Sequence, residues 1–448
     1  MITARAFAGK HYAVYGLARS GLATVEALLA SGARVTAWDD RLLPGEGRGL
    51  GGGEAAVSAA LDPGLRRGTE LANLNETDLT QFNSLIVTPG LPLNRHPIAQ
   101  RARDAGVEII GDIELFARAR PELPPHKVVG ITGTNGKSTT TALVHQILKT
   151  AGVPTTMGGN IGLPILAQDP LPEGGVYVLE LSSYQLDLTQ SLDCDVAVLL
   201  NITPDHLDRY ESFEAYRDSK LRLFEMQSEG HWSILADGSV SEWILEHRPD
   251  IQLDLFGPPA PHPGWPDQGR WPALKGPHNA QNVSAVEGVR VALGIHIDKT
   301  FMPGGSYESY PGLPHRMERI RERDGVLFVN DSKATNPTAT APALAAFEKI
   351  RWICGGQAKT DNLDECAPQF GHVRTAYTIG EAAELFERLL SPHMSVKNCG
   401  KLDVAVREAA ADAQAGDTVL LSPACASFDQ FRDFEDRGDQ FRALVEGL

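Results

Sequence analysis

The stretch from Val128 to Thr141 combines glycines, a lysine and hydroxyl residues in the pattern best suited to bind phosphate. An apolar β-branched run predicts a strand, and the glycines after it let backbone N–H groups turn inward before a helix begins. Lys137 would reach phosphate oxygens, and Ser138 would offer a hydroxyl to Mg²⁺. Ile131 stands where the usual G-x-x-x-x-G-K-[ST] pattern has its first glycine, so this is a variant phosphate loop. A plain glycine turn before a core helix is the alternative.

Two further polar side chains are expected beside this loop. Glu180 ends the buried strand predicted over 176–181, and His206 follows the strand predicted over 195–202. Carboxyl ends of parallel strands meet at one edge of a sheet, so the phosphate loop, Glu180 and His206 should converge there. Both side chains are candidate ligands for Mg²⁺. For His206 alone, capping the next helix is the alternative.

Two helices carry side chains whose roles the spacing leaves open. Lys220 lies on an amphipathic helix predicted over 212–227, and the pattern alone favours a solvated helix face. Asn279 and Asn282 lie three residues apart on one face of a helix predicted over 278–293. They would contact an adenine edge or cap the helix, and the spacing favours capping.

The last third of the chain repeats one arrangement three times. The strands predicted over 326–331, 351–354 and 418–422 each run into small, polar or basic residues. Such strand ends predict one binding surface at the carboxyl edge of a sheet. Asp331 and Lys333 belong to it, or else form only a surface pair.

The first residues resemble a dinucleotide-binding unit. The pattern predicts a strand over 11–15, a glycine turn, a helix to 31 and a strand over 33–40. In a dinucleotide-binding fold, Asp39 or Asp40 at the end of the second strand would bind a ribose or base. Ala18 replaces the second glycine of the G-x-G-x-x-G fingerprint, so an ordinary α/β unit remains the alternative. Residues 43–64 are rich in Gly and Pro and predict a long surface loop.

Strands that alternate with helices predict parallel α/β sheets. With 448 residues the chain should form about three domains. Proline-rich or aperiodic linkers at 121–125 and 302–312 suggest domains at 1–118, 119–311 and 312–448.

Composition excludes several classes of protein. The net charge of −16 argues against a nucleic-acid or anionic-membrane surface. The first residues lack the apolar segment of a secretion signal, and no run of 18 apolar residues occurs, so a cytoplasmic location is expected. Five scattered cysteines without C-x-x-C spacing predict buried, reduced thiols.

Several separated motifs together resemble one family, the Mur ligases of bacterial cell-wall synthesis, over essentially the whole chain. The motif G-T-N-G-K-S-T at 133–139 resembles the family's ATP loop, and L-E-L-S-S-Y-Q-L at 179–186 and D-H-L-D-R-Y at 205–210 follow in the family's order. Two others, N-D-S-K-A-T-N at 330–336 and S-P-A-C-A-S at 422–427, resemble those of members that add D-glutamate. The turn Gly158–Gly162 and the stretch Gly312–Arg316 follow in the family's order.

The resemblance implies three α/β domains: a Rossmann-like UDP-binding domain, a P-loop-type ATP-binding domain and a Rossmann-like C-terminal domain. It implies that ATP phosphorylates the carboxylate of UDP-N-acetylmuramoyl-L-alanine and that the amine of D-glutamate displaces phosphate. Charge neutralisation by Mg²⁺ and Lys137 suits a reaction between two anions. A monomer is expected.

Roles for individual residues also follow from the resemblance alone. Catalysis would involve Lys137, His206 and Lys220. ATP would contact Gly133, Thr134, Asn135, Gly136, Lys137, Ser138, Thr139, Asn279, Asn282, Arg316 and Asp331. Two metal ions would be ligated by Ser138, Glu180, His206 and Lys220, the lysine being carbamylated. The UDP substrate would contact Ala18, Arg19, Ser20, Asp39, Arg41 and Asn160, with His206 also facing its muramoyl part. D-glutamate would contact Lys333, Thr335, Lys359, Ser427, Phe428 and Phe434.

The sequence departs from the family pattern in two places. The loop 45–64 is long, and Gln357 and Ala358 stand where an acid and a glycine are common. A ligase for L-glutamate stays open, since pocket shape sets chirality. Two other classes also stay open: a nucleotide-sugar oxidoreductase, which would bind NAD without ATP turnover, and a non-catalytic nucleotide-gated binding protein.

Overall fold

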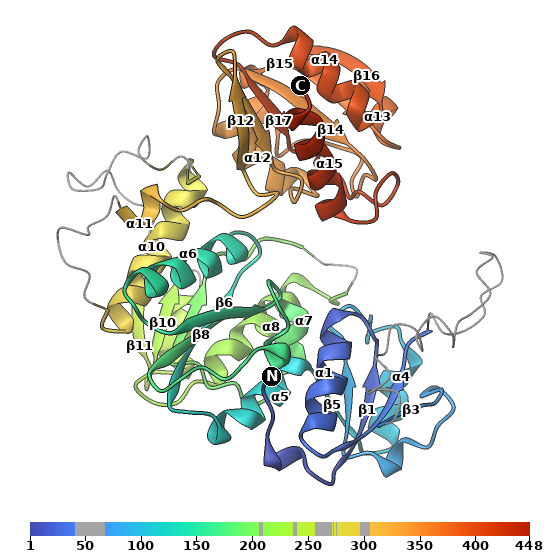
Figure 1. The fold of residues 1–448 in the computed structure, drawn as a ribbon, viewed down its shortest axis with the longest axis vertical. Coiled ribbons are helices and arrows are strands. Elements are labelled where there is room, and N and C mark those ends of the chain that lie inside the picture. The colour runs from blue at the N-terminus through green and yellow to red at the C-terminus, as the bar shows by residue number, and fades with distance from the viewer. Residues whose placement is uncertain are drawn as a thin grey trace. The chain divides into compact units, whose positions relative to one another are not determined.

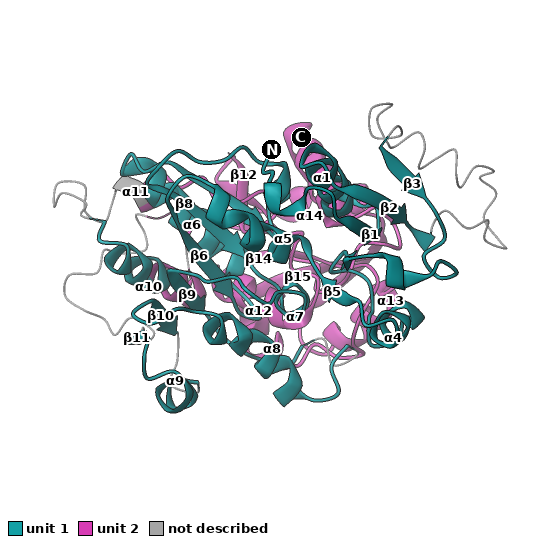
Figure 2. Ribbon diagram, turned by 90° about the horizontal axis from the view of Figure 1, so that it is seen from below, with its two compact units in different colours: residues 1–257, 284–296 teal, residues 258–283, 297–448 magenta. Residues whose placement is uncertain are grey.

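The computed structural model describes residues 1–40, 68–205, 209–235, 240–255, 271, 273–274, 276–295 and 305–448, with side chains from 307 in the last range. The chain divides into two compact units (Figure 2). The first comprises Met1–Gly257 with Ser284–His296, and the second comprises Pro258–Val283 with Ile297–Leu448.

The first sheet belongs to unit 1 and is parallel throughout, in the order β3-β2-β1-β4-β5. Figure 1 labels β1, β3 and β5 of this sheet. Its strands are β1 (His11–Tyr15), β2 (Arg34–Trp38), β3 (Thr69–Leu71), β4 (Ser84–Val87) and β5 (Glu108–Ile110). Its helices are α1 (Arg19–Ala30), α4 (Pro97–Asp104) and α5 (Asp112–Ala119). Every residue of β1 and β4 is buried, as expected for central strands of a parallel sheet covered on both faces.

The second sheet also belongs to unit 1 and is parallel, in the order β11-β10-β9-β6-β8-β7. Its strands are β6 (His126–Thr132), β7 (Thr155–Gly159), β8 (Gly175–Glu180), β9 (Val196–Leu199), β10 (Trp232–Leu235) and β11 (Gln252–Leu255). Its helices are α6 (Lys137–Thr150), α7 (Ser183–Asp187), α8 (Phe213–Glu225) and α9 (Ser241–His247). The strand order reverses beside β6, and ligands bind at such switch points.

The third sheet belongs to unit 2, in the order β12-β13-β17-β14-β15-β16, with only β12 antiparallel to its neighbour. Its strands are β12 (Glu318–Arg323), β13 (Val326–Asn330), β14 (Ile350–Gly355), β15 (Val373–Ile379), β16 (Ser395–Gly400) and β17 (Thr418–Leu421). Its helices are α12 (Pro337–Ala345), α13 (Ala383–Leu390), α14 (Leu402–Asp412) and α15 (Phe434–Glu446). The helix α10 (Pro277–Ala292) crosses the division between the two units.

The predicted elements are confirmed with small shifts. The helix after the phosphate loop begins at Lys137, two residues earlier than the residue pattern suggested. The expected linker at 302–312 contains a short helix, α11 (Gly305–Glu308), and a 3₁₀ turn, Arg120–Glu122, leads into the proline cluster. The surface loop predicted over 43–64 lies outside the described residues.

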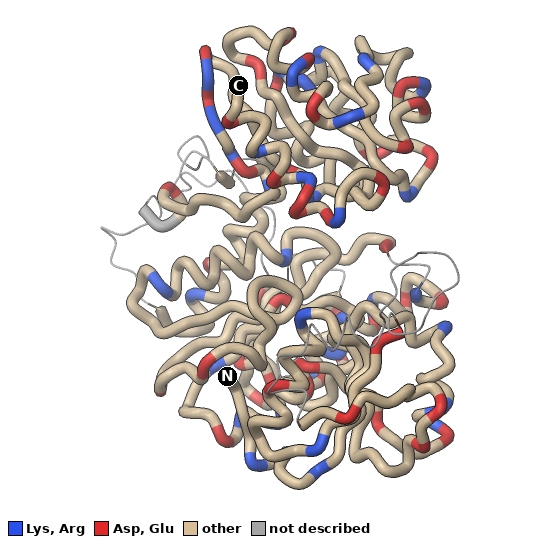
Figure 3. The backbone as a smooth tube through the Cα atoms, turned by 45° about the vertical axis from the view of Figure 1, so that its right-hand side comes forward, with Lys and Arg blue, Asp and Glu red and all other residues tan. Residues whose placement is uncertain are grey.

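Surface and thiol chemistry agree with the composition. Acidic and basic residues are interspersed over both units (Figure 3). All five cysteines are free, and four of them are buried, as predicted. Among the described residues, no helix is both long and apolar enough to cross a membrane.

Candidate active site

The phosphate loop joins β6 to α6, and its turn requires glycine. Gly133 and Gly136 have φ angles of 149° and 88°, a backbone conformation that L-residues with a side chain rarely adopt. A Cβ on Gly133 would lie 3.3 Å from the backbone nitrogen of Asn201, just beyond β9. Asn201 fixes the loop, because its backbone oxygen accepts from the N–H of Thr134 and its side-chain oxygen from the N–H of Asn135, both at 2.9 Å. The predicted strand, turn and helix are therefore confirmed.

Lys137 folds over its own loop at the N-terminus of α6. Its Nζ donates to the carbonyl oxygens of Gly133 and Thr134 at 2.9 and 2.8 Å. The ammonium group therefore sits above the turn, at the helix end that favours anions.

Ser138 and Glu180 meet beside the loop, as the strand-end argument predicts. The Ser138 hydroxyl donates to Oε2 of Glu180 at 2.5 Å, and Nδ2 of Asn160 donates to Oε1 at 2.9 Å. Glu180 ends β8 and is only 2% exposed. Each carboxylate oxygen thus has a donor, which offsets the cost of burying the charge.

Lys220 is buried in α8, so the solvated helix face that its spacing favoured is wrong. Its side chain is 1% exposed, and its Nζ donates to Gly133 O at 3.1 Å and lies 4.5 Å from the ring centroid of Tyr216. Burial, and then the charge of Lys137, hold the pKa of Lys220 well below its usual range. Two lysines therefore converge on one carbonyl oxygen of the phosphate loop.

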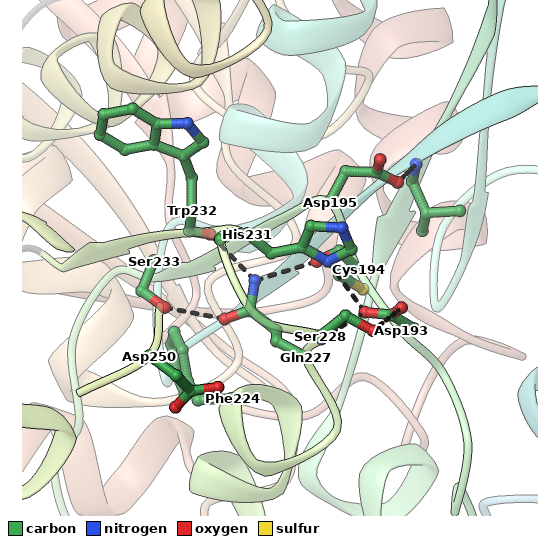
Figure 4. Close-up of polar contacts among 12 residues, drawn as sticks. Asp193, Cys194, Asp195, Phe224, Gln227, Ser228, His231, Trp232, Ser233 and Asp250 are labelled. Atoms are coloured by element: carbon green, nitrogen blue, oxygen red, sulfur yellow. Dashed lines mark hydrogen bonds and ion pairs between the residues drawn. The ribbon is translucent and has the colours of Figure 1, made fainter. Parts of the chain in front are cut away.

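A polar network fixes the end of the helix that carries Lys220 (Figure 4). Nε2 of Gln227 donates to the backbone oxygens of Cys194 and Trp232 at 2.9 and 3.0 Å. Its Oε1 accepts from the hydroxyl of Ser233 at 2.7 Å. Since Cys194 precedes β9 and Trp232 begins β10, the end of α8 is tied to two neighbouring strands.

The turn after β1 and the start of α1 contain three of the predicted UDP contacts, Ala18, Arg19 and Ser20. Nη2 of Arg19 donates to the oxygen of Gly162, in the turn that carries Asn160. Asp39 is 7% exposed and accepts the N–H of Leu17 at 2.8 Å, which fixes the turn after β1. The other candidate, Asp40, accepts from the hydroxyl of Tyr15 at 2.5 Å.

Two predicted site residues, Arg41 and His206, lie outside the described residues. In the part of the chain that the structure describes, no group of three or more His, Cys, Asp or Glu side chains could hold a metal ion.

In unit 2 the three polar strand ends lie side by side, because β17 runs between β13 and β14. Oδ2 of Asp331 accepts from the hydroxyl of Ser422 at 2.8 Å, and Oδ1 accepts the N–H of Met317. Asp331 is 7% exposed, and burial raises its pKa to about 7. The surface-pair alternative is therefore wrong for this carboxyl group.

The predicted glutamate contacts gather on the loops after these strands. Nζ of Lys333 lies 3.7 Å from the ring centroid of Phe434, and Nζ of Lys359 lies 3.5 Å from the hydroxyl of Thr335. The other two members differ in exposure: Ser427 is buried and Phe428 is 68% exposed.

Asn279 and Asn282 are both buried in the first turns of α10. Nδ2 of Asn282 donates to Oδ1 of Asn279 at 3.1 Å, so the predicted common face is confirmed. Arg316 follows His315, whose φ of 62° marks a tight turn before β12.

Three Mur ligase models match successive parts of the chain. They are the MurD-like N-terminal domain (residues 10–111), the Mur ligase middle domain (131–254) and the Mur ligase, glutamate ligase domain (315–425). A UDP-N-acetylmuramoylalanine--D-glutamate ligase of Novosphingobium aromaticivorans is 56% identical, over 100% of this chain and 97% of the relative. A protein of the same name from Sphingopyxis alaskensis is 55% identical over the whole of both chains. This chain belongs to the Mur ligase family.

A solved structure shows the same fold at low identity. MurF ligase from Thermotoga maritima, crystallised in complex with ADP, has a TM-score of 0.58 and 17% identity, with 98% of this chain and 96% of that chain covered. Each family model covers much of one sheet of this Mur ligase, so the predicted family and three-domain α/β fold are confirmed.

Arg437 organises the C-terminal loops of this Mur ligase, and the sequence reasoning missed it. It is fully buried on α15, and burial lowers its pKa to about 10. Its guanidinium donates to Oγ and O of Ser332 at 2.9 and 2.8 Å, and to the oxygens of Cys425 and Ala426. It thereby joins the two motifs typical of D-glutamate-adding members. The sequence does contain a signal for the burial of Arg437, because Arg437, Phe441 and Val445 follow one another at intervals of four residues and so lie on the same buried face of α15.

The departure at Gln357 leaves the backbone of the site intact. The N–H of Gln357 donates to Ala426 O at 2.9 Å, and the N–H of Ala426 donates back at 3.0 Å, while the Gln357 side chain is exposed. An exposed side chain tolerates replacement here because the backbone makes the contact.

Proposed function

We propose that this Mur ligase joins D-glutamate to the carboxylate of UDP-N-acetylmuramoyl-L-alanine at the expense of ATP. The observation that carries the proposal is the convergence of Lys137, Ser138, Glu180 and Lys220 at the carboxyl edge of the central sheet. The substrates are inferred from relatives that are more than half identical over the full chain and are named UDP-N-acetylmuramoylalanine--D-glutamate ligase. Three matching Mur ligase domains disfavour an oxidoreductase and a non-catalytic binding protein.

The proposed reaction has two steps. A carboxylate oxygen of the UDP-linked substrate attacks the γ-phosphorus of ATP, and ADP leaves. The amine of D-glutamate then attacks the acyl carbon, and phosphate leaves while the amine loses a proton. In the first step two anions meet, and Lys137 with the N–H groups of the loop at 133–139 would stabilise the charge that they share.

The residues near the loop fit a magnesium ion bound mainly to phosphate. Mg²⁺ prefers oxygen ligands and commonly takes only one or two from the protein, and Ser138 and Glu180 offer a hydroxyl and a carboxylate in contact with each other. The ion would supply charge neutralisation between the phosphate and the attacking carboxylate. His206 would add a ligand by the family resemblance.

Lys220 would become an anion by reacting with carbon dioxide. Its lowered pKa keeps part of the side chain neutral, and the neutral amine can attack CO₂, forming a carbamate and releasing one proton. The new carboxylate would attract Lys137 where the ammonium repels it, and would offer oxygen to the second metal ion.

The remaining substrate groups would be held by the residues that the resemblance assigns. The nucleotide would contact Asn279, Asn282, Arg316 and Asp331. UDP would contact Ala18, Arg19, Ser20, Asp39 and Arg41, and the muramoyl part would contact Asn160 and His206. D-glutamate, with two carboxylates and an amine, would contact Lys333, Thr335, Lys359, Ser427, Phe428 and Phe434, where cations and hydroxyls are available.

The organisation of the molecule follows from the same proposal. We place domain boundaries near 118 and 311, which keeps each sheet within one domain. One chain carries all the motifs, so a monomer of 48.3 kDa is expected by light scattering. Because the proposed reaction consumes ATP, it is expected in the cytoplasm.

The test is phosphate release from ATP with Mg²⁺ and UDP-N-acetylmuramoyl-L-alanine. D-glutamate, L-glutamate, meso-diaminopimelate and no amino acid are compared, and release with D-glutamate alone is expected. Lys137→Ala should lose at least about 100-fold in rate, whereas Lys149→Ala, at the exposed other end of α6, should keep full activity. Release with another amine would change the substrate, and no release with any amine would refute the proposal.

A further inference from the structure

A series of aromatic rings leads from the phosphate loop to Arg209. The hydroxyls of Thr134 and Tyr216 are 3.1 Å apart, and the ring centroids of Tyr216 and Tyr210 are 5.4 Å apart. Tyr210 stacks on Tyr184 with centroids 6.0 Å apart and planes 15° apart. Cζ of Arg209 lies 4.3 Å from the Tyr184 ring centroid. We call Tyr184, Tyr210 and Tyr216 the aromatic ladder.

Arg209 reaches from the ladder to the loop that follows β4 of the N-terminal sheet. Its guanidinium donates to the backbone oxygens of Leu91, Gly90 and Pro89 at 2.9, 3.3 and 3.4 Å. A planar guanidinium can serve several carbonyls while one face stacks on a ring, whereas a lysine ammonium cannot do both equally well. The side chain of Arg209 thus attaches the loop after β4, residues 88–93, to the central domain.

This loop lies where the N-terminal sheet should bind its ligand. The strand order reverses between β1 and β4, and ligands bind at the carboxyl ends of strands at such a point. The turns after these two strands pack closely, because a Cβ on Gly16 would lie 2.3 Å from Oγ1 of Thr88. Any shift of the loop after β4 would therefore disturb the turn after β1, which carries the predicted UDP contacts.

Packing alone does not fix the loop on the ladder side. A cavity of about 150 Å³ is lined by Pro89, Leu91, Leu93, Tyr184, Arg209 and Tyr210, among others. The ladder is itself held rigidly, because the Tyr210 hydroxyl donates to Oδ2 of Asp187 at 2.7 Å. Its last ring, Tyr216, lies against Lys220 in the phosphate site.

We propose that Arg209 is a positioning residue for the UDP-linked substrate. It holds the loop 88–93 in register with the phosphate loop through the aromatic ladder, so that the acceptor carboxylate is presented to the phosphate being transferred. The inference rests on the proposed function for its substrate, but the attachment of the loop can be tested without any substrate.

Steady-state kinetics test the positioning role. Arg209→Ala should raise the KM for UDP-N-acetylmuramoyl-L-alanine at least about tenfold, equivalent to about 1.4 kcal/mol, with the KM for ATP within about twofold. For Arg209→Lys, the KM for UDP-N-acetylmuramoyl-L-alanine should lie between the values for the wild type and for Arg209→Ala. Tyr184→Leu should also raise this KM, and the double variant should be no worse than Arg209→Ala. The matched control is Arg217→Ala, which removes a half-buried arginine paired with Asp218 on α8.

Hydrogen exchange tests the attachment without substrate or activity. Amides of residues 88–94 should exchange faster in Arg209→Ala and not in Arg217→Ala. Unchanged exchange in Arg209→Ala, an unchanged KM for the UDP substrate, or an equal rise in the KM for ATP would each overturn the inference. A wild-type protein without ligase activity would instead refute the proposed function, and the exchange result would still decide whether Arg209 holds the loop.

Discussion

Replacing Lys220 by methionine should stabilise the central domain while abolishing ligation. The nitrogens of Lys220 and Lys137 share Gly133 O at 3.1 and 2.9 Å. They lie at most about 6 Å apart, where two full charges would repel by about 3 kcal/mol at an effective dielectric constant of 20. Where Lys220 loses its proton on folding instead, this repulsion is replaced by the cost of that deprotonation. The variant loses a hydrogen bond and a contact with the Tyr216 ring, together worth about 1–2 kcal/mol. A net gain of about 1–2 kcal/mol at pH 7 is expected.

The gain should depend on pH in a defined direction. The pKa of Lys220 is lowered in the folded chain, so between that pKa and about 10.4 the unfolded chain binds more protons. Wild-type stability therefore rises with pH across this window. Methionine does not titrate, so the advantage of Lys220→Met should shrink toward pH 10. Added bicarbonate should stabilise the wild type through the carbamate and leave Lys220→Met unchanged.

Local stability is the quantity to measure, because a multidomain chain need not unfold in one step. Hydrogen exchange of α8 and the phosphate loop, in CO₂-free buffer from pH 6 to pH 10, reports it directly. Lys149→Met, at an exposed position, should change stability by less than about 0.5 kcal/mol. A variant that is less stable at pH 7, or a difference without pH dependence, would refute the reasoning.

Three further predictions concern single side chains. Lys220→Ala should be almost inactive and partly rescued by short carboxylates, and full activity in this variant would remove the carbamate. Asp331→Asn should stabilise unit 2 by about 2–4 kcal/mol at pH 8 and progressively less toward pH 4. The cause is the raised pKa of Asp331, which makes the wild type lose stability as pH rises through about 7. Urea denaturation measures the difference in stability, and a difference that does not change with pH would contradict the prediction. Arg437→Ala should lower the free energy of unfolding by about 3 kcal/mol or more, because buried carbonyl oxygens lose their donors. It should also raise the KM for D-glutamate, and an unchanged melting temperature would count against the loss of stability.

Local signals were sufficient for the elements and for the phosphate site. The run ending at Thr132 and the turn with Gly133 and Gly136 specify a strand, a turn and a helix within a few residues. Glu180 could be placed beside Ser138 because parallel strands align their carboxyl ends. Such reasoning needs only periodicity and the rules of parallel sheets.

The residue pattern could not predict which charged side chains are buried. Lys220 has the spacing of a surface residue, but its ammonium group is buried and donates to a carbonyl oxygen 87 positions away in the chain. Arg437 likewise bonds Ser332, 105 positions away. Helical periodicity shows which face is apolar but not whether a distant loop will satisfy a cation on that face.

The place of β17 in its sheet bears on how the chain is made. β17 is the last strand in the sequence, yet it separates β13 from β14, and Ser422 bonds Asp331 from 91 positions away. A chain still on the ribosome that has reached residue 400 therefore holds two strands with unpaired inner edges, which invite wrong partners. The sheet of unit 2 can close only after the residues of β17, Thr418–Leu421, have been made. A stop codon between residues 400 and 418 would thus remove the centre of this sheet rather than its margin.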